Sequence, residues 1–359
     1  MCGETIHRSA AFLGLVAALS APGIAVAAPG LTAYVLSAGG NSTVGAAGPP
    51  LSCATFAPDS LATVFAGTFQ NSLPTDGSAC GVGVDSRSVS GPTPLFVASS
   101  LAVGFGAPGD PRTSTGSAAG RADYGHLGVQ AVSTYSGASD AFTVAGSQAG
   151  ARQTETMTFT GAGAVGAGTY RPTFTIDGSI FNRGRTETEI EFGYSTGTGP
   201  NLLAFRIINS QSSGISLYAN GGYQASLPGM TTTGDVVNGY TVAGATTFSM
   251  NIPIVFGTAI DVNFQMWAAT LPRSNIGLLT ASSGDASFIS SARLTGIEVL
   301  DAAGHVLSDF SISAGSGTAY GPGGVIAVPE PGSSSLMLAG LVALGAAGVR
   351  RRASRHTDQ

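Results

Sequence analysis

The chain has 359 residues and a formal net charge of −5, and only 10% of its residues are charged. All 15 basic residues are arginine, and glycine occurs 53 times, about twice its usual share. Because a Walker-type phosphate loop needs lysine, that nucleotide site is excluded, and the acidic balance argues against nucleic-acid binding. Thr-rich and aliphatic runs separated by glycine favour strands over helices.

Residues 1–27 have the pattern of a secretory signal peptide. Arg8 precedes an apolar run at 10–19, and Ala25 and Ala27 form a small-x-small cleavage site. We expect a signal helix that is removed after Ala27, with the Sec translocon and signal peptidase as partners. A transmembrane anchor is the alternative, but the apolar run is short for one. Without this segment and the tail from residue 331, the body keeps 10 arginines against 18 acidic residues, a net charge near −8.

Two cysteines remain in the exported body, Cys53 and Cys80. In an oxidising compartment two thiols default to a disulfide, and we expect Cys53 to pair with Cys80. Two free buried thiols are the alternative.

The body divides by pattern into two stretches. Residues 111–326 predict the main β-sandwich. Residues 28–110 predict strands and long loops of the same sandwich, including apolar runs at 61–69 and 94–105. Residues 106–123 are rich in Gly, Pro and Ser and predict a loop or weak boundary.

The clearest strand pattern lies at 246–257, followed by a turn at 257–259 and a second alternating run at 260–266. One face of each run is apolar and the other polar, so the apolar faces must be buried against another sheet. Residues 286–315 add two strands around a turn at 301–304. With no amphipathic helix of length between residues 28 and 325, the fold class predicted is all-β, an antiparallel and jelly-roll-like β-sandwich.

Two patterns raise the question of a ligand. Glu187, Glu189 and Glu191 alternate along one predicted strand and share a face. Such spacing suits a calcium site or a glycosidase pair, and the alternative is a charged face that simply meets water. Trp267, the only tryptophan, could stack on a sugar, as could Tyr218 and Tyr223, but a lone Trp is more often packed.

Other motifs argue against cofactors and metals. Gly161, Gly163 and Gly166 match the spacing of a dinucleotide fingerprint, but no helix is expected after them, so we expect a hairpin loop. Only His126 and His305 remain in the body, which disfavours a zinc site. We therefore expect no cofactor and no catalytic residue, with calcium as the one alternative.

The tail has three parts. Val328, Pro329, Glu330, Pro331 and Gly332 form an extended turn that no helix crosses. Residues 333–349 carry no charge and predict a single short transmembrane helix. Arg350, Arg351 and Arg352 come next as a cytoplasmic stop.

This combination resembles the PEP-CTERM sorting signal of Gram-negative bacteria, with the tail spanning 327–359. The resemblance implies that a membrane protease, exosortase, recognises Pro329, Glu330 and Pro331 and removes or transfers the tail. It implies a transient anchor in the inner membrane and a final place at the cell surface or in the extracellular matrix. Residues 286–315 and 122–131 also look like strands of the β-sandwich bodies found in such proteins.

The body admits three hypotheses. The first is a non-catalytic structural or adhesive protein of the envelope or exopolysaccharide matrix. The second is a carbohydrate-binding module that uses aromatic side chains, and the third is a glycan hydrolase that uses the three glutamates.

Overall fold

The computed structural model describes residues 29–41, 82–105, 112–137, 143–184, 186–197, 199, 202–210, 214–219, 222–235, 237–272 and 281–326. The predicted signal peptide, the Cys53–Cys80 pair, the strand at 61–69 and the tail from 327 lie outside these residues. In the described ranges, no helix has the length and apolar character needed to span a membrane.

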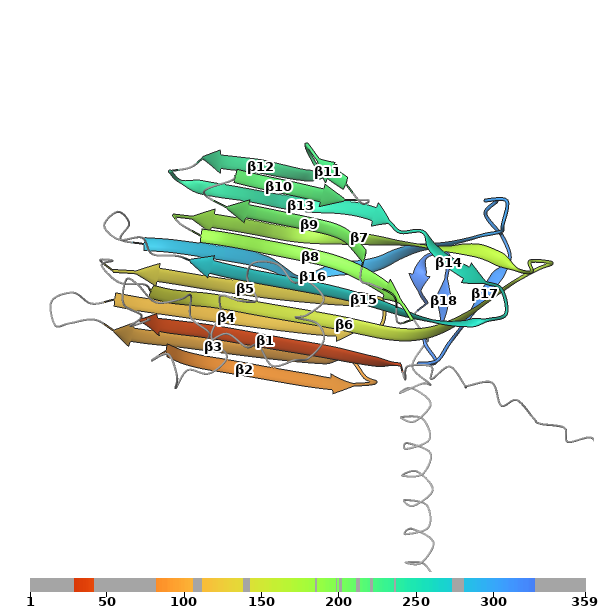
Figure 1. Ribbon diagram of the computed structural model, residues 1–359, viewed down its shortest axis with the longest axis horizontal. Helices are drawn as coiled ribbons and strands as arrows, with labels where there is room; N and C mark the ends of the chain where they lie inside the picture. Colours follow the sequence, from red (N-terminus) through yellow and green to blue (C-terminus); the bar gives the residue numbers. More distant parts are fainter. Residues whose placement is uncertain are drawn as a thin grey trace, which may run out of the picture.

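Sheet A contains nine of the described strands (Figure 1). Eight lie side by side in one path across the sheet, and β17 (Phe310–Ala314) pairs with β6 beside this path. The order is β11 (Gly222–Gln224), β10 (Gly214–Ala219), β9 (Leu202–Ser210), β8 (Thr186–Thr196), β15 (Ala259–Pro272), β6 (Thr143–Gly161), β1 (Gly30–Asn41) and β2 (Val82–Gly91).

Sheet B contains eight described strands, of which β14 (Ile252–Val255) pairs with β7 beside the main path. A further two-stranded sheet consists of β18 (Tyr320–Gly321) and β19 (Gly324–Val325). The order of sheet B is β12 (Met230–Asp235), β13 (Gly239–Ser249), β7 (Ala167–Arg183), β16 (Ala281–Leu300), β5 (His126–Ser136), β4 (Arg112–Asp123) and β3 (Leu95–Phe105).

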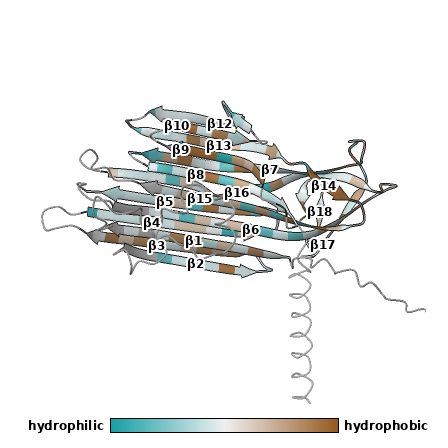
Figure 2. Ribbon diagram, in the orientation of Figure 1, coloured by the Kyte–Doolittle hydropathy of each residue, from teal (hydrophilic) through white to brown (hydrophobic). Residues whose placement is uncertain are grey.

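The two sheets face each other and enclose one core, and the prediction of an all-β protein with antiparallel sheets is confirmed for the described residues. Apolar and polar positions alternate along the strands, as the bands of colour in Figure 2 show. Phe264 and Met266 of β15 are buried inward, as the alternating pattern predicts.

The predicted strand at 246–257 is split into β13 and β14, which both pair with β7. The turn predicted at 257–259 is present, and Gly257 adopts a φ of 76° there.

One half of the core is built from phenylalanines contributed by both sheets. Phe174 of β7 lies 4.8 Å from Phe192 of β8 and 5.0 Å from Phe264 of β15, measured between ring centroids. Phe248 of β13 lies 5.3 Å from Phe192 and 5.7 Å from Phe205 of β9. Because each ring touches the opposite sheet, this cluster fixes how β7 and β13 sit over β8, β9 and β15.

The other half is packed with small side chains, and here the loop or weak boundary predicted at 106–123 is wrong for residues 112–123, while 106–111 lie outside the described residues. Residues 112–123 form β4, whose inward positions include Ser114, Gly116 and Ala118. A Cβ at Gly116 would lie 2.8 Å from the Ser147 Oγ of sheet A. The strand was hidden because its core face holds small residues rather than the large apolar side chains that mark a strand in sequence.

A second correction concerns residues 161–167. No helix comes after the three glycines, as predicted, but the segment is not a hairpin between paired strands. It carries the chain from β6 in sheet A to β7 in sheet B. Likewise β17, which comes after the turn at 301–304, pairs with β6 of the opposite sheet rather than with β16.

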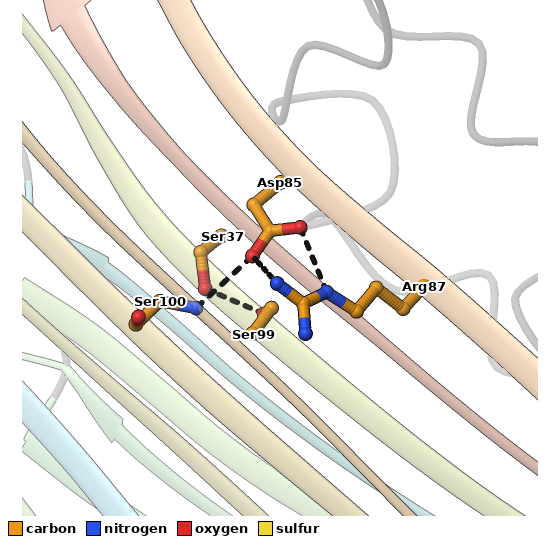
Figure 3. Close-up of polar contacts among 5 residues, drawn as sticks. All are labelled: Ser37, Asp85, Arg87, Ser99 and Ser100. Carbon is orange, nitrogen blue, oxygen red and sulfur yellow. Dashed lines mark hydrogen bonds and ion pairs between the residues drawn. The ribbon is translucent and has the colours of Figure 1, made fainter.

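Polar contacts close the edge where β2 and β3 meet (Figure 3). The Ser100 backbone N–H on the edge strand β3 donates to Asp85 Oδ2 on β2 at 3.2 Å. Arg87 donates to both carboxylate oxygens of Asp85, at 3.1 and 2.9 Å. The Ser37 and Ser99 hydroxyls, 2.9 Å apart, link the sheets just inside. An N–H that could recruit another strand is thereby occupied within the molecule.

Hydroxyl pairs replace charges on the exposed face of sheet B. Cross-strand pairs join Thr173 to Ser249 at 2.8 Å and Thr113 to Ser136 at 2.7 Å. Cross-strand Thr and Ser pairs stabilise a sheet and keep its outer face hydrated. A body with few charges therefore still has a polar surface.

We predict that Phe174→Ala lowers the free energy of unfolding by about 3–5 kcal/mol, since it removes a fully buried ring that contacts both sheets. Urea denaturation of the body measures this loss. Phe96→Ala is the matched control, because that ring is 64% exposed and its loss should cost no more than about 0.5 kcal/mol. Equal losses for the two variants would contradict the described core.

Candidate functional site

The outer face of sheet A carries a row of aromatic and charged side chains that crosses the sheet. Strand pairing places Arg206 of β9 opposite Glu191 of β8, and Glu191 opposite Trp267 of β15. Trp267 is opposite Gly150 of β6, and Gly150 is opposite Tyr34 of β1. Because directly paired residues share a face, we define these five residues as the outer row. Five strands far apart in sequence thus contribute to one site.

A carboxyl pair and one arginine form the charged part of the site. The Arg206 Nε–H donates to Glu189 Oε1, and the same nitrogen forms an ion pair with Glu191 Oε1 at 2.8 Å. Both glutamates are buried, whereas the Arg206 side chain is 25% exposed. The two carboxyls lie close enough to influence each other's protonation, and the Oε2 atom of each is buried without a hydrogen-bond partner. Two anions around one cation in a buried place are most stable when the pair holds a proton.

The protonation of Glu189 results from this arrangement. Burial raises the pKa of Glu189 to about 8, with the charge of Glu191 adding to the rise and Arg206 opposing it. Burial also raises the pKa of Glu191, although the neighbouring Glu189 carboxyl and the charge of Arg206 lower it. Glu189 therefore holds a proton near neutral pH, and Arg206 is the cation beside the pair.

An aromatic pair continues the row. The Trp267 indole lies within hydrogen-bonding reach of the Tyr34 hydroxyl, and burial raises the pKa of Tyr34. The Tyr34 ring lies directly over Gly150, where a Cβ would come within 1.9 Å of ring carbon Cε1. Glycine at 150 is thus required by this close approach. Trp267 is buried on the outer face of sheet A, so it is not part of the apolar core between the sheets.

A buried amide lies in the neighbouring row. Gln148 of β6 is fully buried, and neither its Oε1 nor its Nε2 has a hydrogen-bond partner. Pairing places Ala269 of β15 between Gln148 and Glu189. Ala269 is small, so the polar groups in this row are the longer side chains of Gln148 and Glu189 on either side of it. A buried amide without partners costs on the order of 1–3 kcal/mol, so Gln148 is held here at a cost in stability.

The row reaches solvent at the edge of sheet A. Tyr218 of β10 is opposite Arg206, and Tyr223 of β11 is opposite Tyr218. The two tyrosine rings meet edge to face with centroids 5.6 Å apart, and Tyr223 is 64% exposed. We call Tyr218 and Tyr223 the edge tyrosines. The site is therefore open at the tyrosine edge and becomes increasingly buried toward Trp267.

The structure brings together three of the four ligand-binding candidates from the sequence. Glu189, Glu191 and Trp267 lie on one face of sheet A, and the alternative of a charged face that simply meets water does not hold for Glu189 and Glu191, which are buried. Glu187 is partly buried at the start of β8. Among the described residues, no group of three metal-ligating side chains is present.

Sequence reasoning missed Arg206, Gln148, Tyr34 and Gly150. Arg206 lies in an ordinary alternating strand, and no local signal links it to two glutamates on β8. Only the registers of β8, β9, β15, β6 and β1 bring these residues together. Buried polar residues on the outer face would have been a usable signal, but which residues are buried there becomes known only after the strands have been paired.

The comparisons with known proteins identify the tail. Residues 327–352 match the family described as the PEP-CTERM protein-sorting motif. The chain therefore carries the signal of proteins that are exported, sorted at the membrane toward the cell surface and processed by exosortase. No curated protein and no solved structure matches the chain.

We predict that Glu189 makes the stability of the body depend on pH. Because its folded pKa of about 8 lies above the ordinary value of 4.5, the folded protein keeps a proton that the unfolded chain releases between these values. The free energy of unfolding should therefore fall as the pH rises from about 4.5 to about 8.

Thermal melting of the wild type and of Glu189→Gln across this range measures the effect. We expect the melting temperature of the wild type to fall more steeply with pH than that of the neutral variant. Parallel curves would show that Glu189 is ionised throughout and would contradict its raised pKa.

Proposed function

We propose that the exported body is a non-catalytic, glycan-binding protein that acts as an adhesive or structural component of the cell surface or exopolysaccharide matrix. The sorting motif supports the location. The outer row and the edge tyrosines support the binding. The sequence alternatives of adhesion and carbohydrate binding thus become one proposal, in which glycan binding is the means of adhesion.

The observation that carries this proposal is the continuity of the row. An exposed tyrosine pair leads directly to Arg206 and the two carboxyls, on one face of one sheet. Sugars present apolar ring faces to aromatic side chains and hydroxyls that both donate and accept hydrogen bonds. Arg206, whose side chain is 25% exposed beside the edge tyrosines, supplies donors, and the buried carboxyls behind it hold the guanidinium in place. The exposed end of the row therefore offers a saccharide both an aromatic face and hydrogen-bond donors.

The carboxyl pair argues against hydrolysis. Retaining glycosidases hold their two carboxyls about 5–5.5 Å apart, and inverting enzymes about 6.5–9.5 Å. The Nε atom of Arg206 contacts one oxygen of Glu189 and one of Glu191, so the guanidinium occupies the place beside both carboxyls that a sugar carbon or a water would need. The pair is suited to holding Arg206 in place rather than to attacking a glycosidic bond.

We predict that Tyr223→Ala weakens binding to the glycan by at least about fivefold, as the loss of a contact aromatic does at many interfaces. A panel of bacterial exopolysaccharides, followed by titration calorimetry with the best binder, measures the affinity. Because Tyr223 is exposed, the melting temperature should not change. Phe96→Ala is the matched control, since that ring is equally exposed but lies on sheet B.

Two outcomes would contradict the proposal. Binding to no glycan of the panel would leave a purely structural role for the body. Turnover of a glycan that is lost in Glu189→Gln would establish a hydrolase instead.

A further inference from the structure

The segment that leads into the sorting motif is anchored to the body by a buried polar cluster. Glu155 of β6 is fully buried and accepts hydrogen bonds from the Ser316 N–H at 3.0 Å and from the Tyr320 hydroxyl at 3.3 Å. The Ser316 hydroxyl also donates to it. Gln153 Nε2 donates to the Tyr320 hydroxyl at 3.1 Å. We call these four residues the C-terminal clamp.

The clamp is itself held by the body. Gln153 Oε1 accepts a hydrogen bond from the Gly125 N–H at 2.7 Å, in the turn between β4 and β5. Burial raises the pKa of Tyr320, which therefore keeps its hydroxyl proton. A buried carboxylate whose donors are all supplied by one segment fixes that segment, because releasing it would leave the charge without partners.

The last described residues form a hairpin that is held against β16 and the turn between β4 and β5. The Ile297 N–H on β16 donates to the Pro322 carbonyl at 2.9 Å, and the Ile326 N–H donates to the Ala319 carbonyl at 2.8 Å. Val325 packs over Gly125, where a Cβ would lie 2.3 Å from its Cγ2. We call β18, β19 and Ile326 the terminal hairpin.

The tether between the hairpin and the motif is short. The motif match begins at residue 327, directly after Ile326. Pro329 is the third residue after Ile326, and three residues of even fully extended chain span only about 10 Å. A protease that binds Pro329, Glu330 and Pro331 must therefore lie against the body at the terminal hairpin.

The terminal hairpin presents an apolar surface at this place. Ile326 is 53% exposed and Val325 is 37% exposed, although both immediately precede the motif. Exposed branched aliphatic side chains on a rigid hairpin are inexpensive to bury, because little conformational entropy remains to be lost.

We propose that the terminal hairpin is part of the surface that exosortase binds, so that the enzyme reads the sorting motif together with the folded end of the body. The C-terminal clamp fixes the chain up to the terminal hairpin, directly before the motif, which lowers the entropic cost of recognition. The body then contributes to its own sorting.

The test is a pulse-chase of the full chain in a host with exosortase, measuring the fraction that is processed over time. We expect Ile326→Ser to slow processing by about fivefold, the factor that burial of about half of an isoleucine side chain supplies. Val237→Ser is the matched control, because Val237 is 76% exposed in the turn after β12 and should leave the rate unchanged.

A second variant tests the tether without changing any side chain. Six Gly and Ser residues inserted between Ile326 and Ala327 uncouple the motif from the hairpin, and we expect slower processing. Protease resistance of the body checks that each variant is folded.

Wild-type rates in both variants would overturn the proposal, and faster processing of the insertion would show that the body obstructs the enzyme. In a host without exosortase, Ile326→Ser should not alter membrane retention. A weaker membrane association there, at an unchanged processing rate, would assign the hairpin to the lipid surface instead.

Discussion

The pairing of β15 with β6 on one side and β8 on the other is the constraint on which the site depends. All these strands are long, and each has an apolar face that the core buries. A shift of one residue in either pairing would turn that face outward, so the register is fixed by the core. The same register places Trp267 between Glu191 and Gly150. The core of the sandwich thus determines which residues meet on its outer face.

The site carries an energetic cost that a simple structural sheet would not. Glutamates on the outer face of a sheet are normally hydrated, whereas Glu189 and Glu191 are buried beside one arginine. Removing a carboxylate from water costs several kcal/mol unless it is neutralised or paired. A proton on Glu189 and the charge of Arg206 reduce this cost, but the Gln148 amide has no such compensation. Groups held at a cost in stability are typical of binding sites.

The two halves of the sandwich are stabilised in different ways. Phenylalanines fill the space between β7, β13 and the strands opposite them, and small residues and hydroxyls fill the space between β4, β5, β1 and β6. In that second half Ser147 Oγ donates to the Val132 carbonyl at 2.7 Å across the sheets. Buried hydroxyls that have hydrogen-bond partners lower the stability of the fold little. A chain rich in Gly, Ala and Ser can therefore still bury the inward faces of both sheets.

The sequence by itself determined the class of fold and the destination of the chain. Alternation at 246–266 required strands with one buried face, and the tail motif is a contiguous pattern that can be recognised from the sequence alone. It also placed Glu189, Glu191 and Trp267 among the candidates, since alternation decides which residues share a face. Only the tertiary structure decided that β4 is a strand, that Arg206 joins the two glutamates, and that Glu155 holds Tyr320. Those contacts join residues distant in sequence, and their formation depends on strand order and register, which no local pattern encodes.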